Sequence, residues 1–61
     1  LRLLAVDYDG RLYGIGKLGW MNFSYKTSDD NFLREITNIN MKIYKIAWVG
    51  GEDFMFLGEN Y

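Results

Sequence analysis

Short runs rich in apolar residues, separated by turn residues, dominate the pattern of this chain and predict β-strands. Residues 1–8 and 11–17 are two such runs, and the dipeptide Asp9-Gly10 lies between them. Asp-Gly strongly favours a two-residue hairpin turn, because both positions of that turn require a positive φ. We therefore predict an antiparallel β-hairpin with its turn at Asp9-Gly10.

A second hairpin is predicted close to the end of the sequence. Residues 42–49 and 53–60 are β-like runs that flank Gly50-Gly51. Between the two hairpins, residues 20–27 alternate apolar and polar side chains, which indicates a further strand. This strand is followed by a cluster of polar residues, where we expect a loop.

Residues 32–39 fit two kinds of element. The apolar positions of this stretch are Phe32, Leu33, Ile36 and Ile39. They match a helical stripe at least as well as strand alternation. A helix of about nine residues is marginal by itself, because Thr and Asn are poor helix formers. A strand at residues 32–37 and a helix at about 29–39 therefore both stay open.

The first predicted hairpin resembles the second in sequence. Aligning Leu1 with Ile43 without gaps matches Leu4 with Ile46, Ala5 with Ala47, Leu12 with Phe54, Ile15 with Leu57 and Gly16 with Gly58. The two positions are 42 residues apart (43 − 1). This offset is typical of β-propeller blades, which are four-stranded sheets that repeat about every 40–45 residues. We therefore predict an all-β fold with one blade-like, four-stranded repeat at residues 1–42 and the hairpin of a second repeat at 43–61. The four strands of the first repeat are expected at 1–8, 11–17, 20–27 and 32–37.

The length of the chain limits what it can bury. A domain of 61 residues removes only about 60% of its unfolded surface from water, and without Cys or His it has neither a disulfide nor a His-containing metal site. A closed propeller typically has about four or more blades. We therefore expect that the chain is completed by a homo-oligomer or by the remainder of a larger propeller.

Charge and composition narrow the range of partners. The net charge is −1 and 18% of the residues are aromatic, which argues against disorder. Basic residues are scattered singly, so we expect no binding of nucleic acid. The opening stretch "LRLLAV" carries an Arg and is far too short for a signal peptide or a membrane span. We therefore expect no membrane association, and the sequence shows no targeting signal for a compartment.

Two motifs resemble the repeats of known lectins. Residues 10–15, "GRLYGI", match the "G-x-LYGV"-like strand of the tachylectin pattern, and residues 30–34, "DNFLR", match its later segment of "DNW", an apolar residue, a basic residue and "I". The chain is thus similar to tachylectin-type lectin propellers. It is more loosely similar to the Asp-box repeats of sialidase-like propellers, because Ser28-x-Asp30 begins an Asp box.

The sequence also departs from the lectin pattern. Phe32 stands in place of Trp, and Arg34 comes one position early. The double Pro of the lectin repeat is missing, because the chain contains no Pro. Gly19-Trp20-x-x-Phe23 follows the first hairpin, whereas the family has its "GGW-x-x-F" before the hairpin.

The resemblance implies a carbohydrate site at the loop that carries Asp30 and Asn31, with Asp29 beside them. In tachylectin-like propellers this loop faces the groove between blades, where carboxylate, amide and backbone groups hydrogen-bond sugar hydroxyls. Trp20 and Tyr25 are expected to add an aromatic wall, since flat side chains stack on the apolar face of a sugar ring. The alternative role of Asp30 and Asn31 is to shape the turn.

Residues 7–11 raise a catalytic alternative. "DYDGR" resembles the first motif of the haloacid dehalogenase-like phosphatases, in which the first Asp attacks phosphorus and the second moves the proton. That family has Thr where this chain has Arg11, and 61 residues cannot hold its large α/β domain. Without Cys or His, the common bases, nucleophiles and zinc ligands are missing too. We therefore expect a protein that is not an enzyme, with no catalytic residue, no cofactor and no metal site.

Two functions from different classes follow from these patterns. The first is a non-catalytic, lectin-like binding module of propeller type, with carbohydrate as the expected ligand. The second is a small protein-binding inhibitor or interaction domain of β-β-α-β-β type. In that α+β alternative, a helix at about 29–39 packs on a four-stranded sheet, and the exposed face of the sheet binds a protein.

Overall fold

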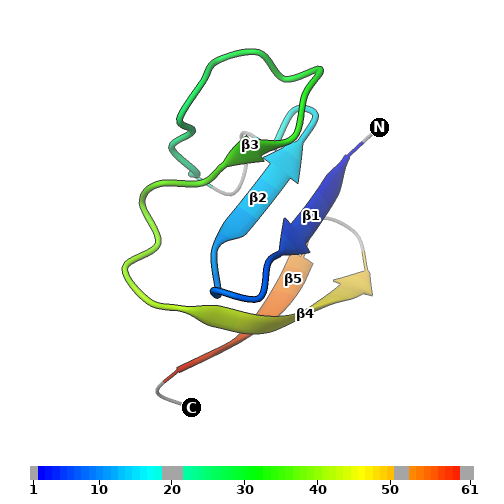
Figure 1. Cartoon of the computed structure of the whole chain (residues 1–61). Helices are drawn as coiled ribbons and strands as arrows, with labels where there is room; N and C mark the ends of the chain where they lie inside the picture. Colours follow the sequence, from blue (N-terminus) through cyan, green and yellow to red (C-terminus); the bar gives the residue numbers. More distant parts are fainter. Residues whose placement is uncertain (1, 19–21, 51–52, 60–61) are drawn as a thin grey trace.

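The structure, a computed structural model, describes residues 2–18, 22–50 and 53–59. Its strands are β1 (Leu3–Val6), β2 (Leu12–Ile15), β3 (Arg34–Glu35), β4 (Ile43–Gly50) and β5 (Asp53–Gly58) (Figure 1). No helix occurs within those residues, so the predicted all-β class is confirmed. The α+β alternative is not supported, because the stretch at 29–39 holds β3 and its flanking loops.

The first sheet joins β1, β2 and β3 in that order, and both pairs are antiparallel. Gly14 of β2 lies opposite Arg34 of β3. Within β2, Leu12 and Gly14 are buried while Tyr13 and Ile15 are half-buried. Successive side chains of a strand point to opposite faces, so one face of β2 packs into the interior.

The strand predicted at residues 20–27 is largely missing from this sheet. The described part of the segment forms one isolated bridge, between Tyr25 and Ile36. The N–H of Lys26 also donates to the C=O of Glu35 at 2.9 Å. The segment therefore lies on the edge of β3 that faces away from β2, although it precedes β3 in the chain. The predicted strand at residues 32–37 is shortened to β3.

A side chain takes over the pairing where this segment leaves the sheet. Asn22 has a φ of 55°, in the left-handed region, which turns the backbone out of the extended conformation. The Oδ1 atom of Asn38 accepts a hydrogen bond from the N–H of Ser24 at 2.9 Å, and its Nδ2 donates to the C=O of Asn22 at 2.8 Å. The amide thus satisfies backbone groups that a neighbouring strand would otherwise pair.

The first predicted hairpin is confirmed, but its turn differs from the prediction. The N–H of Gly10 donates to the C=O of Asp7 at 3.1 Å, and the N–H of Asp7 donates to the C=O of Arg11 at 3.1 Å. These bonds centre the turn on Tyr8 and Asp9, and Gly10 follows with a φ of 83°. The predicted positive φ at both Asp9 and Gly10 is therefore wrong, because only the glycine adopts it. The pattern is that of a three-residue hairpin loop closed by a left-handed bulge residue.

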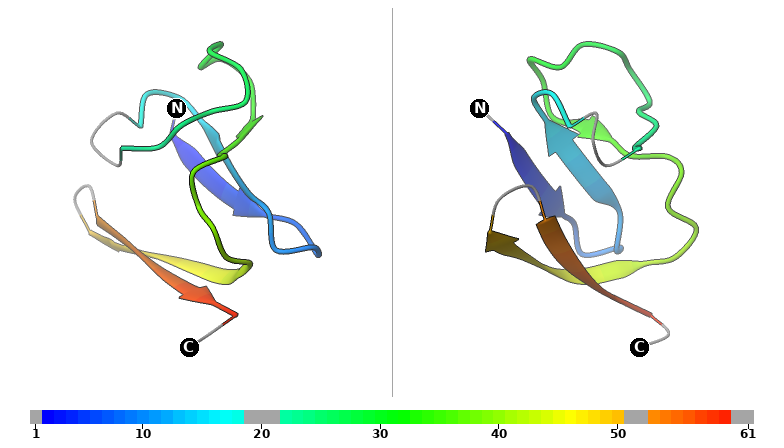
Figure 2. Two further views of the ribbon diagram at one scale, coloured as in Figure 1. Left: turned by 90° about the vertical axis from the view of Figure 1, so that its left-hand side faces the viewer. Right: turned by 180° about the vertical axis from the view of Figure 1, so that it is seen from behind.

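The second sheet is the antiparallel pair of β4 and β5, which we call the ribbon. Ile43 lies opposite Gly58 and Gly50 lies opposite Asp53, with irregular register after Ile43 and after Trp48. This pairing confirms the second predicted hairpin, although Gly51 of its turn lies outside the described residues. The ribbon forms a separate layer in which β4 lies against β1 (Figure 2).

The buried apolar residues of the described chain are Leu12, Leu18, Ile36 and Ile43. Where the first hairpin meets the start of β4, the N–H of Ile43 donates to the C=O of Gly10 at 2.9 Å. A Cβ atom at Gly10 would lie 2.6 Å from the Cβ of Lys42, so the close approach of the first hairpin requires glycine here. The sheets fall on either side of Lys42, the predicted boundary between repeats. Their assignment as propeller repeats stays a prediction.

Candidate functional site

The loop that follows Ser28 is a tight turn held by Asp29. The Oδ1 atom of Asp29 accepts a hydrogen bond from the N–H of Asn31 at 3.0 Å, and its C=O accepts one from the N–H of Phe32 at 3.4 Å. A carboxylate that bonds the backbone two residues ahead is a typical turn former. Asp29, one of the predicted ligand residues, therefore shapes the loop.

This loop is fixed against the end of β2 by a backbone hydrogen bond. The N–H of Gly16 donates to the C=O of Asp30 at 2.8 Å. An open hollow of about 560 Å³ lies at this junction, and we call it the loop hollow. It is lined by Arg2, Ile15, Gly16, Lys17, Asp30 and Asn31. Two of the predicted ligand residues thus meet the end of β2 and a cation from the start of the chain.

The side chains of Asp30 and Asn31 take no part in the hydrogen bonds of the described fold. Asp30 contributes its backbone C=O and Asn31 its backbone N–H. Neither side chain forms a hydrogen bond or an ion pair with another described residue. The hollow is therefore lined by a carboxylate and an amide whose hydrogen-bonding capacity the described chain leaves unused.

The predicted aromatic wall consists of Trp20 and Tyr25. Trp20 lies outside the residues that the structure describes, and Tyr25 does not line the hollow. The ring of Tyr25 lies under the guanidinium of Arg34, with 3.7 Å from Cζ to the ring centroid. Its other neighbour is Phe23, whose ring meets it edge-on at 6.3 Å between centroids. Burial raises the pKa of Tyr25.

Arg34 is a buried cation bonded to Gly16, a residue of the lining. Its side chain is only 6% exposed, and Nη2 donates to the C=O of Gly16 at 2.8 Å. In the described part of the chain it has no carboxylate partner, and its Nε has no hydrogen-bond partner. A charge in this position acts strongly on its surroundings, because little solvent screens it.

The cations of the site were not identified from the sequence. Arg2 and Lys17 were counted only among scattered basic residues, and Arg34 only as a motif position. These residues are far apart in the chain, and the sheet brings them around Gly16. No local sequence signal marks such a gathering, because it depends on which segments pair.

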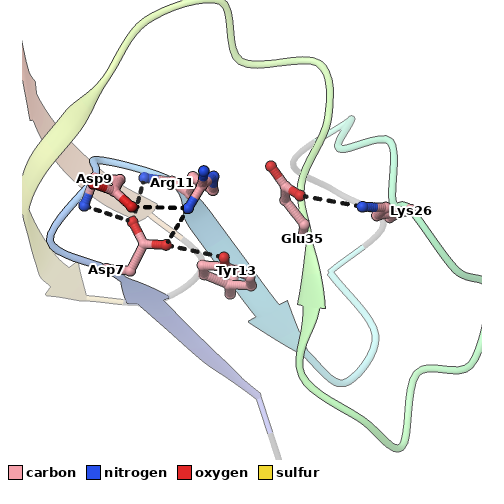
Figure 3. Close-up of polar contacts among 6 residues, drawn as sticks. All are labelled: Asp7, Asp9, Arg11, Tyr13, Lys26 and Glu35. Atoms are coloured by element: carbon pink, nitrogen blue, oxygen red, sulfur yellow. Dashed lines mark hydrogen bonds and ion pairs between the residues drawn. The ribbon is translucent and has the colours of Figure 1, made fainter.

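A second polar cluster holds the first hairpin (Figure 3). The Oδ1 atom of Asp7 accepts hydrogen bonds from the N–H groups of Asp9 and Arg11 at 3.0 and 2.8 Å. Its Oδ2 accepts from Nη1 of Arg11 at 3.3 Å and from the hydroxyl of Tyr13 at 3.0 Å. The backbone N–H of Arg11 contributes most to lowering the pKa of Asp7, and the bond to Asp7 raises the pKa of Tyr13. The residues of the phosphatase-like motif thus bind one another within the turn.

The described residues contain no group of three or more His, Cys, Asp or Glu side chains that could hold a metal ion. In the same ranges, no helix is long and apolar enough to cross a membrane. The chain matches no family model, no curated protein and no solved structure. Its class follows from its own fold and site, those of an all-β protein with an open hollow lined by polar and cationic side chains.

Proposed function

We propose that this protein is a non-catalytic binding module that binds carbohydrate at the loop hollow. One observation carries the proposal: Asp30 and Asn31 line the hollow with side chains that the described fold does not use. These residues also match the lectin-like motif position by position. A carboxylate accepts hydrogen bonds, and an amide both donates and accepts them. Sugar hydroxyls, which both donate and accept, are complementary to this set.

The open shape of the hollow favours weak binding at each site, with affinity gained when several sites act together. The hollow is open to solvent, so it contacts only part of a sugar ring. Phe32, which follows Asn31 in the chain, is 65% exposed and offers a ring face next to the loop. Several linked sites of this kind gain avidity that one site lacks, which makes assembly useful for the proposed function.

Asn31→Ala tests the proposal against the alternative that Asn31 only shapes the turn. The turn uses the backbone N–H of Asn31, which alanine retains, so we expect an unchanged thermal unfolding temperature. Glycan binding, measured on a glycan array and by titration with the glycans found there, should be lost. The matched control is Asn40→Ala, an exposed residue that does not line the loop hollow, and it should bind as the wild type does.

Three results would contradict the proposal. If Asn31→Ala binds glycan as tightly as the wild type, the amide does not contact the ligand. If the variant loses stability and keeps binding once folded, Asn31 acts in the turn. A wild-type protein that binds nothing on the array at millimolar monosaccharide sensitivity is not a lectin.

We further propose that the ribbon is covered by another blade-like unit, from a second copy or from the remainder of a larger propeller. Trp48 and Met55 support this, because they are 67% and 61% exposed, on opposite faces of the ribbon, and exposed apolar side chains favour association. The repeat alignment matches β5 with β2. β2 pairs with β3 on its second edge, whereas β5 pairs with β4 alone among the described strands. A strand equivalent to β3 would fill that edge.

A further inference from the structure

The charge around the loop hollow is opposite in sign to that of the whole chain. The chain carries a net charge of −1. Among the described residues that line the hollow, Arg2 and Lys17 are cations and Asp30 is a carboxylate. This described part of the lining is net positive, in a chain whose acidic residues outnumber its basic ones.

Arg34 adds to this positive potential. Its guanidinium bonds the C=O of Gly16, a residue of the lining, at 2.8 Å. One face of the guanidinium stacks on the ring of Tyr25, and this cation–π contact stabilises the charge in part. No carboxylate of the described chain neutralises it. Because a buried charge without an ion pair is unfavourable, an anion bound near Gly16 would relieve a cost that the fold already carries.

We propose that the loop hollow selects an acidic sugar, a hexuronate, over the neutral sugar with the same ring. This inference rests on the proposed carbohydrate function and names the class of sugar. Lys17 contacts the carboxylate of the sugar. Asn31 and Asp30 hold its hydroxyls, and Asp30 repels the carboxylate from its own end of the hollow. The ligand is thereby bound in one orientation.

Paired probes test the selection directly. Glucuronate and glucose, displayed on the same linker, differ only in the anionic group, and glucose 6-sulfate carries a different anion on the same ring. We expect glucuronate to be bound about tenfold more tightly than glucose at low ionic strength, because the exposed ammonium of Lys17 attracts the carboxylate. The difference should shrink in high salt, which screens exposed charges.

Lys17→Gln identifies the group that recognises the anion. The side chain of Lys17 is exposed, so the variant should fold normally. Affinity for glucuronate should fall about fivefold while affinity for glucose stays unchanged. Lys17→Arg should restore the preference. The matched control is Lys45→Gln on β4, an exposed lysine outside the lining of the hollow, and it should leave the preference intact.

The outcomes separate this inference from the proposed function. Equal binding of glucose and glucuronate, unchanged in Lys17→Gln, would overturn the acidic selection and leave the carbohydrate site in place. Binding of glucose 6-sulfate without glucuronate would overturn the assignment of a carboxylate. Binding of none of the three probes, with none on the array, would remove the proposed function and this inference together.

Discussion

The carboxylate of Asp7 illustrates how one residue pattern serves two kinds of chemistry. Two Asp residues separated by one position and followed by Gly occur in a phosphatase motif, where the first is a nucleophile. Here the same spacing lets Asp7 accept hydrogen bonds from two backbone N–H groups of the turn, as well as from Arg11 and Tyr13. The hydrogen bonds of the turn are thus enough to explain why Asp and Gly occur at this spacing.

Asp7→Asn should destabilise the protein, because an amide replaces one acceptor oxygen with a group that only donates. The lowered pKa of Asp7 means that the fold favours its charged form. This contribution is complete above the ordinary pKa of 3.8 and is lost as the pH falls through the lower pKa of the folded protein. Thermal unfolding followed from neutral to strongly acidic pH should therefore show less acid-induced loss in Asp7→Asn than in the wild type.

The control for this experiment is Asp30→Asn, whose carboxylate makes no hydrogen bond within the described chain. This variant should retain most of the acid-induced loss. Superimposable acid profiles of Asp7→Asn and the wild type would mean that the hydrogen bonds of Asp7 contribute nothing to stability.

At the scale of elements, the two hairpins could be predicted and the order of the first sheet could not. A hairpin joins neighbours in the chain, so turn residues and flanking apolar runs are enough to indicate it. The segment predicted as a strand at residues 20–27 has the right alternation. Its position beyond β3, however, depends on contacts with Ile36 and on the side chain of Asn38. The alternation of apolar and polar residues indicates which face of a strand is buried. It does not determine which other strand pairs with it.

Asn38→Ala should loosen this segment without unfolding the sheet. The variant loses hydrogen bonds to Ser24 and Asn22, and each such bond contributes about 1 kcal/mol, so we expect a loss of about 1–2 kcal/mol in the free energy of unfolding. Denaturant unfolding measures that loss. Hydrogen exchange at the N–H of Ser24 should accelerate, while Gly14 N–H in β2 stays protected. Unchanged exchange at Ser24 would show that the amide of Asn38 does not hold the segment.

At the scale of the whole molecule, two small sheets share a limited core and leave the ribbon with exposed apolar side chains. A domain of 61 residues has little apolar area to offset the entropy of folding. Association that covers Trp48 and Met55 would add buried area at the place where the fold lacks it. The proposed assembly would therefore stabilise the fold as well as serve the proposed function.

Met55→Lys tests the assembly. Sedimentation at low micromolar concentration should give a mass above 7.2 kDa for the wild type, and Met55→Lys should shift the distribution toward the monomer, because a charge at the covered face must be desolvated. Leu33→Lys is the matched control, since Leu33 is 53% exposed outside the ribbon, and it should leave the mass unchanged. A folded wild-type monomer of 7.2 kDa would contradict the proposal.

The sequence by itself determined the features that depend on near neighbours. Apolar runs and turn residues specified an all-β chain with two hairpins, and the polar cluster at Asp29 specified a loop. These interactions span a few residues, so composition and spacing are enough to predict them. The type of the first turn was missed, because Asp-Gly is compatible both with a two-residue turn and with a turn that ends in a left-handed glycine.

Tertiary structure alone decided the composition of the candidate site. Asp30 and Asn31 were predicted from a motif, whereas Arg2 and Lys17 join them only because β2 ends where the loop returns to Gly16. The same pairing buries Arg34 against Gly16 and places Tyr25 under its guanidinium, away from the hollow. The charge at the site comes from groups that are distant in sequence. These groups come together only when the strands pair, so the sequence alone does not indicate the sign of that charge.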